Sequence, residues 1–253
     1  MIYDLSLSWR GLRTRPVQTL IPMLVVGLAV ALSIAVLALG DAARRGIIQA
    51  SDPFGVLVVG PKGDGQQLVL NTILLQGLPL GTIPYDIYTQ LSSDSRVRLA
   101  VPMAKGDSVS GAPVIGTNAA FFQLRTAINA PPAFQVARGR LFEADFEAVL
   151  GSRAASLLNL NIGDQFRAAH GIGRTLASDL HDDVYTVVGI LAASGTAYDT
   201  AVYVTVETVW EVHAEAEQNP FAVGDAGFAD RLTSVLVQPV GFVEQNLIWQ
   251  EFY

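Results

Sequence analysis

The chain has 253 residues, enough for one large domain or two small ones, and 51% of them are hydrophobic while only 15% are charged. Ordinary soluble domains carry about 25% charged residues, so a membrane segment would explain the difference. The formal net charge of -7 excludes nucleic acid as a partner, because phosphate contacts need clustered Lys and Arg, and the absence of cysteine excludes disulfides and thiolate metal sites.

Residues 1–15 are expected to form a short amphipathic segment at the cytoplasmic membrane surface. Ile2, Leu5, Trp9 and Leu12 recur at helical spacing, and Trp9 has the amphipathic ring that favours a membrane interface. The segment is therefore expected to lie on the bilayer rather than to cross it.

The uncharged stretch 16–40 predicts one transmembrane helix. About 20 apolar residues span the ~30 Å hydrocarbon core, and this stretch is long enough to cross with some tilt. The alternative is a cleaved secretory signal, but the apolar region of such signals usually runs only about 7 to 15 residues. Arg10, Arg13 and Arg15 precede the stretch, so the positive-inside rule places residues 1–15 in the cytoplasm and the main domain outside.

The first part of the outer domain begins with an outward extension of the membrane helix over 42–50. FGVLVVG, at 54–60, predicts a buried strand, and the glycine-rich 60–65 is expected to be a hairpin loop. Residues 68–81 are apolar without clear periodicity, so they could form a helix or a loop near the membrane.

Two clearer patterns follow. Residues 83–94 carry Ile83, Ile87 and Leu91 four apart, which predicts a helix with one apolar face. Residues 96–118 predict two strands joined by a Gly/Asp/Ser turn.

The remaining chain continues as mixed α/β structure after a Pro-Pro pair at 131 and 132. Ser152 is the expected N-cap of a helix, and Val188 lies in the strand VYTVVGIL, which is expected to be buried. The other expected elements are a helix over 153–160, a strand over 165–169, a strand and then a helix over 201–217, a strand over 231–239 and a helix that starts near 241.

Four segments of the outer domain, behind this kind of anchor, resemble the MacB-like class of ABC transporter permeases, which includes macrolide exporters and lipoprotein-releasing permeases. The anchor is LSWRGLRTRPVQTLIPMLVVGLAVAL, and the segments are VIGTNAAFFQL, GRLFEADF, AVLGSRAASLLNLNIGDQF and YTVVGILAASGTAYDTAVYVTVETVW. The resemblance implies an α/β, mixed α+β fold: one N-terminal transmembrane helix and a two-lobed periplasmic core domain. The first lobe would comprise 41–125 and a return strand and helix at 229–253, and the second lobe would be the insert 126–228.

The resemblance also implies a function. The chain would be a permease subunit in the cell (inner) membrane whose outer domain transmits ATP-driven motion to substrate export or extraction. Its expected partners are a cytoplasmic ABC ATPase subunit, a second permease copy, the lipid bilayer and, often, a periplasmic adaptor protein. Such permeases continue with three more membrane helices, so a chain that stops at Tyr253 is expected to be a truncated form or a fragment.

Two other classes of function are weighed against transport. A stand-alone membrane-anchored binding or sensing module is favoured by the missing helices. An enzyme is disfavoured, because the Ser-Gly-Thr run at 194–196 lacks the G-x-S-x-G pattern and 60–65 lacks the Gly-Lys-Ser/Thr ending of a phosphate-binding loop. ATP hydrolysis is therefore expected on a separate subunit.

The histidines suggest one metal site. His170, His181 and His213 all fall in the predicted insert, and three aspartates lie near His181: Asp179, Asp182 and Asp183. Imidazole and carboxylate groups are suitable zinc ligands. The spacing matches no compact zinc motif, so solvated or hydrogen-bonded histidines remain the alternative.

Overall fold

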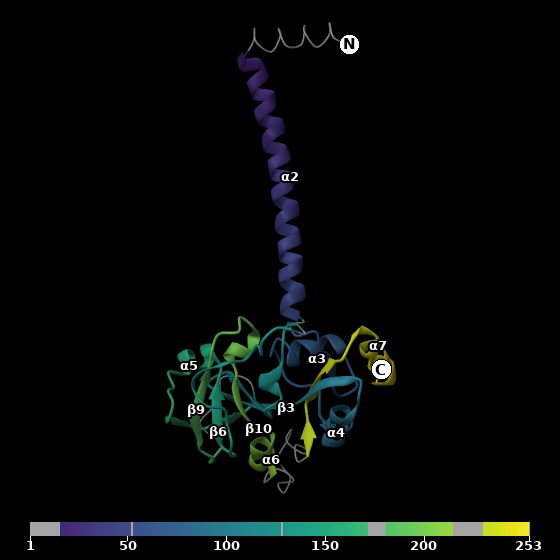
Figure 1. Ribbon diagram of the computed structural model, residues 1–253. Helices are drawn as coiled ribbons and strands as arrows, with labels where there is room; N and C mark the ends of the chain where they lie inside the picture. Colours follow the sequence, from purple (N-terminus) through teal and green to yellow (C-terminus); the bar gives the residue numbers. More distant parts are fainter. Residues whose placement is uncertain (1–15, 52, 128, 172–180, 215–229, 253) are drawn as a thin grey trace. The chain divides into compact units, whose positions relative to one another are not determined.

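A computed structural model describes residues 16–51, 53–127, 129–171, 181–214 and 230–252 (Figure 1). The predicted surface segment 1–15 lies outside these ranges. The chain divides into two compact units, Met1–Gln49 and Ala50–Tyr253, which are described separately below.

All but the last two residues of the long helix α2 (Pro16–Ser51) belong to the first unit, and the second contains five further helices in its described part. Within α2, Pro16–Ala42 is long and apolar enough to cross a membrane, and none of it is buried in the protein. At 1.5 Å per residue this part is about 40 Å long, more than the ~30 Å core requires. The predicted apolar helix and its continuation through 42–50 are therefore confirmed.

The second unit is built on one ten-stranded mixed sheet, with the order β1-β12-β3-β4-β10-β6-β9-β5, while β7 pairs with β9 and β8 with β3. Strand β10 runs parallel to β4 and antiparallel to β6, and β6 runs parallel to β9. The strands of the main sheet are β1 (Leu57–Val59), β3 (Val97–Val109), β4 (Ala112–Thr117), β5 (Val136–Gly139), β6 (Glu147–Leu150), β7 (Gln165–Phe166), β8 (Ala169–His170), β9 (Tyr185–Leu191), β10 (Val202–Thr205) and β12 (Ser234–Pro239).

Helices and a small second sheet complete the unit. Strands β2 (Ile83–Pro84) and β11 (Arg231–Leu232) pair with each other. The helices are α3 (Gly65–Thr72), α4 (Tyr85–Ser93), α5 (Ser152–Leu158), α6 (Val206–Ala214) and α7 (Phe242–Phe252), with 3-10 turns η1 (Phe121–Gln123) and η3 (Ala197–Thr200).

The sheet carries an apolar core on each face. One core contains Leu91 of α4 and Val209 of α6, and the other contains an aromatic group made of Phe54, Phe121, Phe134, Tyr198 and Tyr203. The sheet itself continues from β4 to β10, across the predicted boundary between the first lobe and the insert. The boundaries at residues 126 and 228 stay a prediction.

Two local expectations, for 60–65 and for Ser152, need correction, and the structure resolves the open alternative for 68–81. The loop 60–65 is not a hairpin loop: it joins β1 to α3, where the Asp64 carboxylate accepts a hydrogen bond from Gln66 N at 2.8 Å and caps the helix. Residues 68–81 begin inside α3 and continue as irregular chain. Helix α5 begins at Ser152, so its N-cap is Gly151, which offers no side-chain hydrogen bond. This position requires glycine, because a Cβ there would lie 2.4 Å from the Asp199 carbonyl oxygen.

The predicted helix 83–94 and strand VYTVVGIL are confirmed as α4 and β9. Within β9 the side chain of Val187 is buried, whereas that of Val188 is only partly buried. Val188 was thus the wrong residue to represent the buried face of the strand.

Candidate functional site

A β-bulge in β3 directs Asp107 to one face of the sheet. Ala100 and Ala104 pack in the α6-side core, and Met103 packs in the opposite one. Between Lys105 and Ser108 the pairing with β4 shifts by one residue, and Val109 then lies in the same core as Ala104. Because an extra residue inverts the alternation, Asp107 faces α6 while Lys105 faces away from it.

Helix α6 supplies His213 to the same place. Val206, Val209 and His213 lie three and four residues apart, so they share the buried face of the helix, and His213 is only 1% exposed. His213 Nε2 lies 3.1 Å from Asp107 Oδ2.

The segment that enters β9 supplies His181. Its backbone N–H donates to Ala168 O at 2.9 Å, which ties it to the chain just before β8. His181 Nε2 lies 3.3 Å from Asp107 Oδ1, and the side chain is buried. The third predicted ligand, His170, lies opposite Asp107 in the β3–β8 register, but its side chain lies outside the described set.

The three side chains form a compact buried group. One ligand atom from each of Asp107, His181 and His213 lies within 4.8 Å of the other two. The imidazole rings are 5.5 Å apart at 83°, so they meet edge to face rather than stack. Burial raises the pKa of Asp107, but hydrogen bonds and charge from both histidines outweigh it and hold that pKa below its usual value, so the group is a carboxylate.

Tyr185 stands beside this group. The residue is fully buried, and among the described residues its hydroxyl has no hydrogen-bond partner. Burial raises the pKa of Tyr185, and the negative charges of Asp107 and Asp183 raise it further, which means that the hydroxyl lies within electrostatic reach of the cluster.

On the opposite face of β3, the buried Lys105 is bonded to backbone carbonyl groups and is not part of the Asp107 group. Its ammonium group donates to Asn71 O at 3.2 Å and to Gly77 O at 3.3 Å, so it holds the end of α3 and the chain that follows. Desolvation lowers the pKa of Lys105 to about 8.

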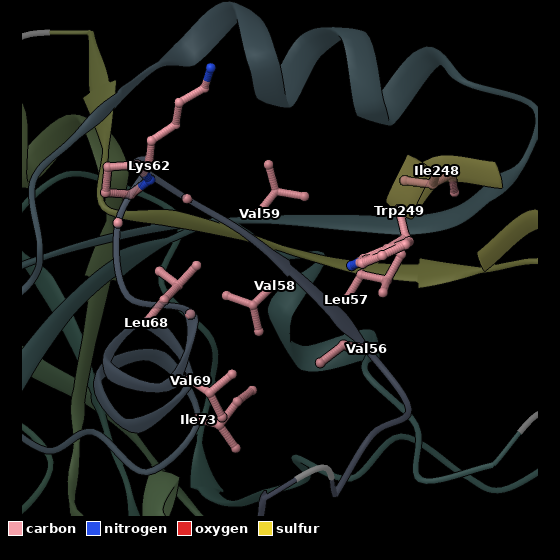
Figure 2. A pocket seen from close by; sticks show the side chains of 14 residues that line it. Val56, Leu57, Val58, Val59, Lys62, Leu68, Val69, Ile73, Ile248 and Trp249 are labelled. Atoms are coloured by element: carbon pink, nitrogen blue, oxygen red, sulfur yellow. The ribbon is translucent and has the colours of Figure 1, made fainter. Parts of the chain in front are cut away.

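A groove lies at the β1 edge of the sheet. It has a volume of about 840 Å³ and is lined mainly by apolar residues of β1, α3 and α7. Figure 2 shows Val58 facing Leu68 and Val69 of α3, while Leu57 lies beside Trp249 of α7. The loop residue Lys62 lies at its rim.

The Ser-Gly-Thr run at 194–196 serves the fold. The Asp199 carboxylate accepts hydrogen bonds from Ser194 N, Ser194 Oγ and Gly195 N at 2.7 to 2.9 Å. These bonds close the turn after β9 onto η3. The arrangement agrees with the interpretation of this run as a strand-ending turn.

The family described as MacB-like periplasmic core domain matches residues 19–239, well over half of the chain. The chain belongs to this family. MacB-like periplasmic core domains are parts of ABC-type transporter permeases and are not themselves enzymes. Together with the apolar helix Pro16–Ala42, the family indicates a membrane-anchored protein with an extracytoplasmic domain.

Two solved structures are similar to this member of the MacB-like family. The periplasmic region of MacB from Actinobacillus actinomycetemcomitans is 15% identical, with a TM-score of 0.43 over 77% of this chain and 78% of that one. The extracellular domain of the noncanonic ABC-type transporter YknZ from Gram-positive bacteria is 12% identical, with a TM-score of 0.42 over 76% and 87%. The search of curated proteins returned no significant match.

Of the three histidines predicted from this MacB-like sequence, the structure brings His181 and His213 together. Sequence reasoning missed Asp107, which it assigned to a turn, whereas the turn of this hairpin is formed by Ser110 and Gly111 at positive φ. Of the aspartates beside His181, Asp182 is exposed and lies 3.9 Å from Arg167, while Asp179 lies outside the described residues.

Proposed function

We propose that this chain is a permease subunit of an ABC transporter whose outer domain transmits ATP-driven motion across the membrane. The observation that carries the proposal is the unbroken helix α2, which extends for 36 residues from Pro16, through the apolar segment, to Ser51. Such a helix is about 54 Å long, so a tilt imposed at its inner end can displace its outer end.

The link from α2 into the domain is short enough to transmit such a tilt. Phe54 follows the last helical residue, Ser51, by only three positions and is itself buried in the aromatic core. Its ring lies 5.5 Å from Phe134 and 5.9 Å from Tyr198, and its carbonyl oxygen accepts a hydrogen bond from Gln238 at 2.8 Å. A displacement of the chain at residue 51 therefore acts on the core through few rotatable bonds.

The proposal includes partners and an orientation. Residues 1–15 lie in the cytoplasm, where a separate ABC ATPase binds and hydrolyses ATP. A second permease copy pairs with this one, and a periplasmic adaptor protein docks on the outer domains. The membrane is the cell (inner) membrane, and the domain lies on its outer side.

The test uses the full chain with Gln90→Cys as its single cysteine, since the natural sequence has none. The exposed Gln90 on α4 is spin-labelled, the protein is purified from native membranes, and distances between labels on two copies are measured with and without an ATP analogue. We expect a nucleotide-binding subunit to co-purify and nucleotide to shift the distances.

Adding Ala42→Pro should abolish that shift, because proline removes a backbone donor and kinks a helix at a cost of about 3 kcal/mol. Ala42→Leu, at the same exposed position, is the matched control and should keep the shift. Failure of any ATPase to co-purify would favour the stand-alone anchored binding or sensing module. Distances indifferent to nucleotide would contradict force transmission.

A further inference from the structure

Three segments that are distant in the sequence bring nitrogen and oxygen ligand atoms together inside the outer domain. Asp107 lies in β3, His181 precedes β9 and His213 lies in the last turn of α6, and all three are buried. We propose that these three residues bind a Zn²⁺ ion, with one coordination position left for water or an incoming ligand.

The ligand atoms have suitable identities and spacing. Two imidazole nitrogens and one carboxylate form a set that suits zinc and that Mg²⁺ and Ca²⁺ disfavour. Two ligands each about 2.0 to 2.1 Å from a tetrahedral ion lie roughly 3.3 Å apart. The distances here are 3.3 Å from His181 Nε2 to Asp107 Oδ1 and 3.1 Å from His213 Nε2 to Asp107 Oδ2, and one ligand atom of each residue lies within 4.8 Å of the other two. Small shifts of the three side chains would therefore bring these atoms to the spacing of ligands around one ion.

The way the rings are presented also favours an ion. Both histidines direct Nε2 toward the same carboxylate, and the rings are nearly perpendicular, at 83°. Neutral imidazole with a free Nε2 lone pair is the form that coordinates zinc. A bound ion would take the place of the protons in the contacts of these nitrogens with Asp107, so that both imidazole nitrogens and a carboxylate oxygen would face one volume.

Tyr185 is the independent observation. Its buried hydroxyl has no hydrogen-bond partner among the described residues, which is unfavourable because a buried polar group loses its hydrogen bonds to water. The charge of Asp107 adds to the effect of burial in raising the pKa of this hydroxyl. A water molecule in the remaining coordination position of the ion would give this hydroxyl the partner that it needs.

The consequence for the domain would be a cross-link. The ion would join β3, which precedes the predicted insert, to α6 and the chain entering β9, which belong to it. Metal binding to a folded but not to an unfolded chain stabilises the fold by mass action. This inference goes beyond transport and does not depend on it.

The experiment measures zinc in the full detergent-solubilised chain, stripped with chelator and then titrated with Zn²⁺, Co²⁺ or Mg²⁺. We expect one Zn²⁺ per chain, a Tm that rises by several degrees with zinc and not with Mg²⁺, and the intense visible absorption of four-coordinate Co²⁺. His181→Ala and His213→Ala should each weaken zinc binding by more than about 100-fold. Loss of a residue that only hydrogen-bonds to a metal ligand typically weakens binding by about 10- to 100-fold, and loss of a ligand should cost more. Glu211→Gln, an exposed change on α6, is the matched control and should bind zinc normally.

The inference would be overturned if the unaltered chain bound no zinc. It would also be overturned if the double variant His181→Ala, His213→Ala kept the same zinc affinity, because the ion would then be bound by surface groups. Circular dichroism of each metal-free variant checks that it is folded. Should a variant not fold, the Co²⁺ spectrum of the unaltered chain decides, because a six-coordinate, weakly absorbing ion would contradict a buried three-ligand site.

Discussion

At the scale of single residues, the buried Lys105 is expected to make the outer domain more stable as the pH rises into the alkaline range. Its pKa falls to about 8 in the fold from 10.5 in the unfolded chain, because burial disfavours the ammonium form. Between these values the unfolded chain binds more protons than the folded chain. The contribution of Lys105 to stability therefore rises as pH rises from about 8 to about 10.5, by up to about 3 kcal/mol.

The measurement is urea unfolding of the chain and of Lys105→Met between pH 7 and 10.5. The difference in the free energy of unfolding between the two should grow in favour of the natural protein over this range. The buried tyrosines, such as Tyr198 and Tyr203, have raised pKa values and act in the opposite direction at high pH, but they are common to both proteins and cancel. A difference independent of pH would show that Lys105 titrates normally.

Residues such as Asp107 mark the limit of prediction from one sequence. The sequence could single out His181 and His213, which the structure brings together, because the chain has only three imidazoles. It could not single out Asp107, because Lys-Gly-Asp-Ser is typical of a turn and only the pairing with β4 reveals a bulge within a 13-residue strand. A bulge depends on the partner strand, which local pattern does not contain.

At the scale of elements, the contact between β9 and the chain after β5 imposes a glycine. A Cβ on Gly189 would lie 2.0 Å from the Arg140 carbonyl oxygen, and backbone cannot yield as a flexible side chain can. We expect Gly189→Ala to lower the free energy of unfolding by about 3 kcal/mol. Gly65→Ala, at the start of α3 where a Cβ meets nothing within 4 Å, is the control and should change stability little.

Chemical denaturation of the two variants measures this effect. Equal midpoints for Gly189→Ala and the natural protein would mean that β9 and the chain after β5 can separate at no cost. The elements themselves were largely predictable: α4 has apolar residues four apart, and β9 is rich in β-branched residues. Helix α3 was ambiguous, since its buried residues include Asn71 and Thr72 and its apolar periodicity is weak.

At the scale of the whole molecule, the orientation of the chain can be tested with the same cysteine-free background. We expect Gln90→Cys on α4 to react with a membrane-impermeant maleimide in intact spheroplasts. Ser6→Cys, in the predicted cytoplasmic segment, should react only after the membrane is permeabilised. The reverse pattern of labelling would invert the proposed topology, and labelling of both sites in intact spheroplasts would indicate that the first segment crosses to the outer side.

The order of strands has a consequence for how the protein is made. Strand β12, at residues 234–239, lies between β1 and β3, and β1 has no other partner in the described sheet. In the proposed topology, a chain synthesised and translocated from its N-terminus exposes β1 and one side of β3 until residues 234–239 have crossed the membrane. During that interval the unpaired edges are open to proteases and to pairing with other chains, and closure is slow because it joins segments about 180 residues apart. In the proposed topology the exported chain therefore carries a half-built sheet, so the rate of translocation should affect the yield of the folded domain.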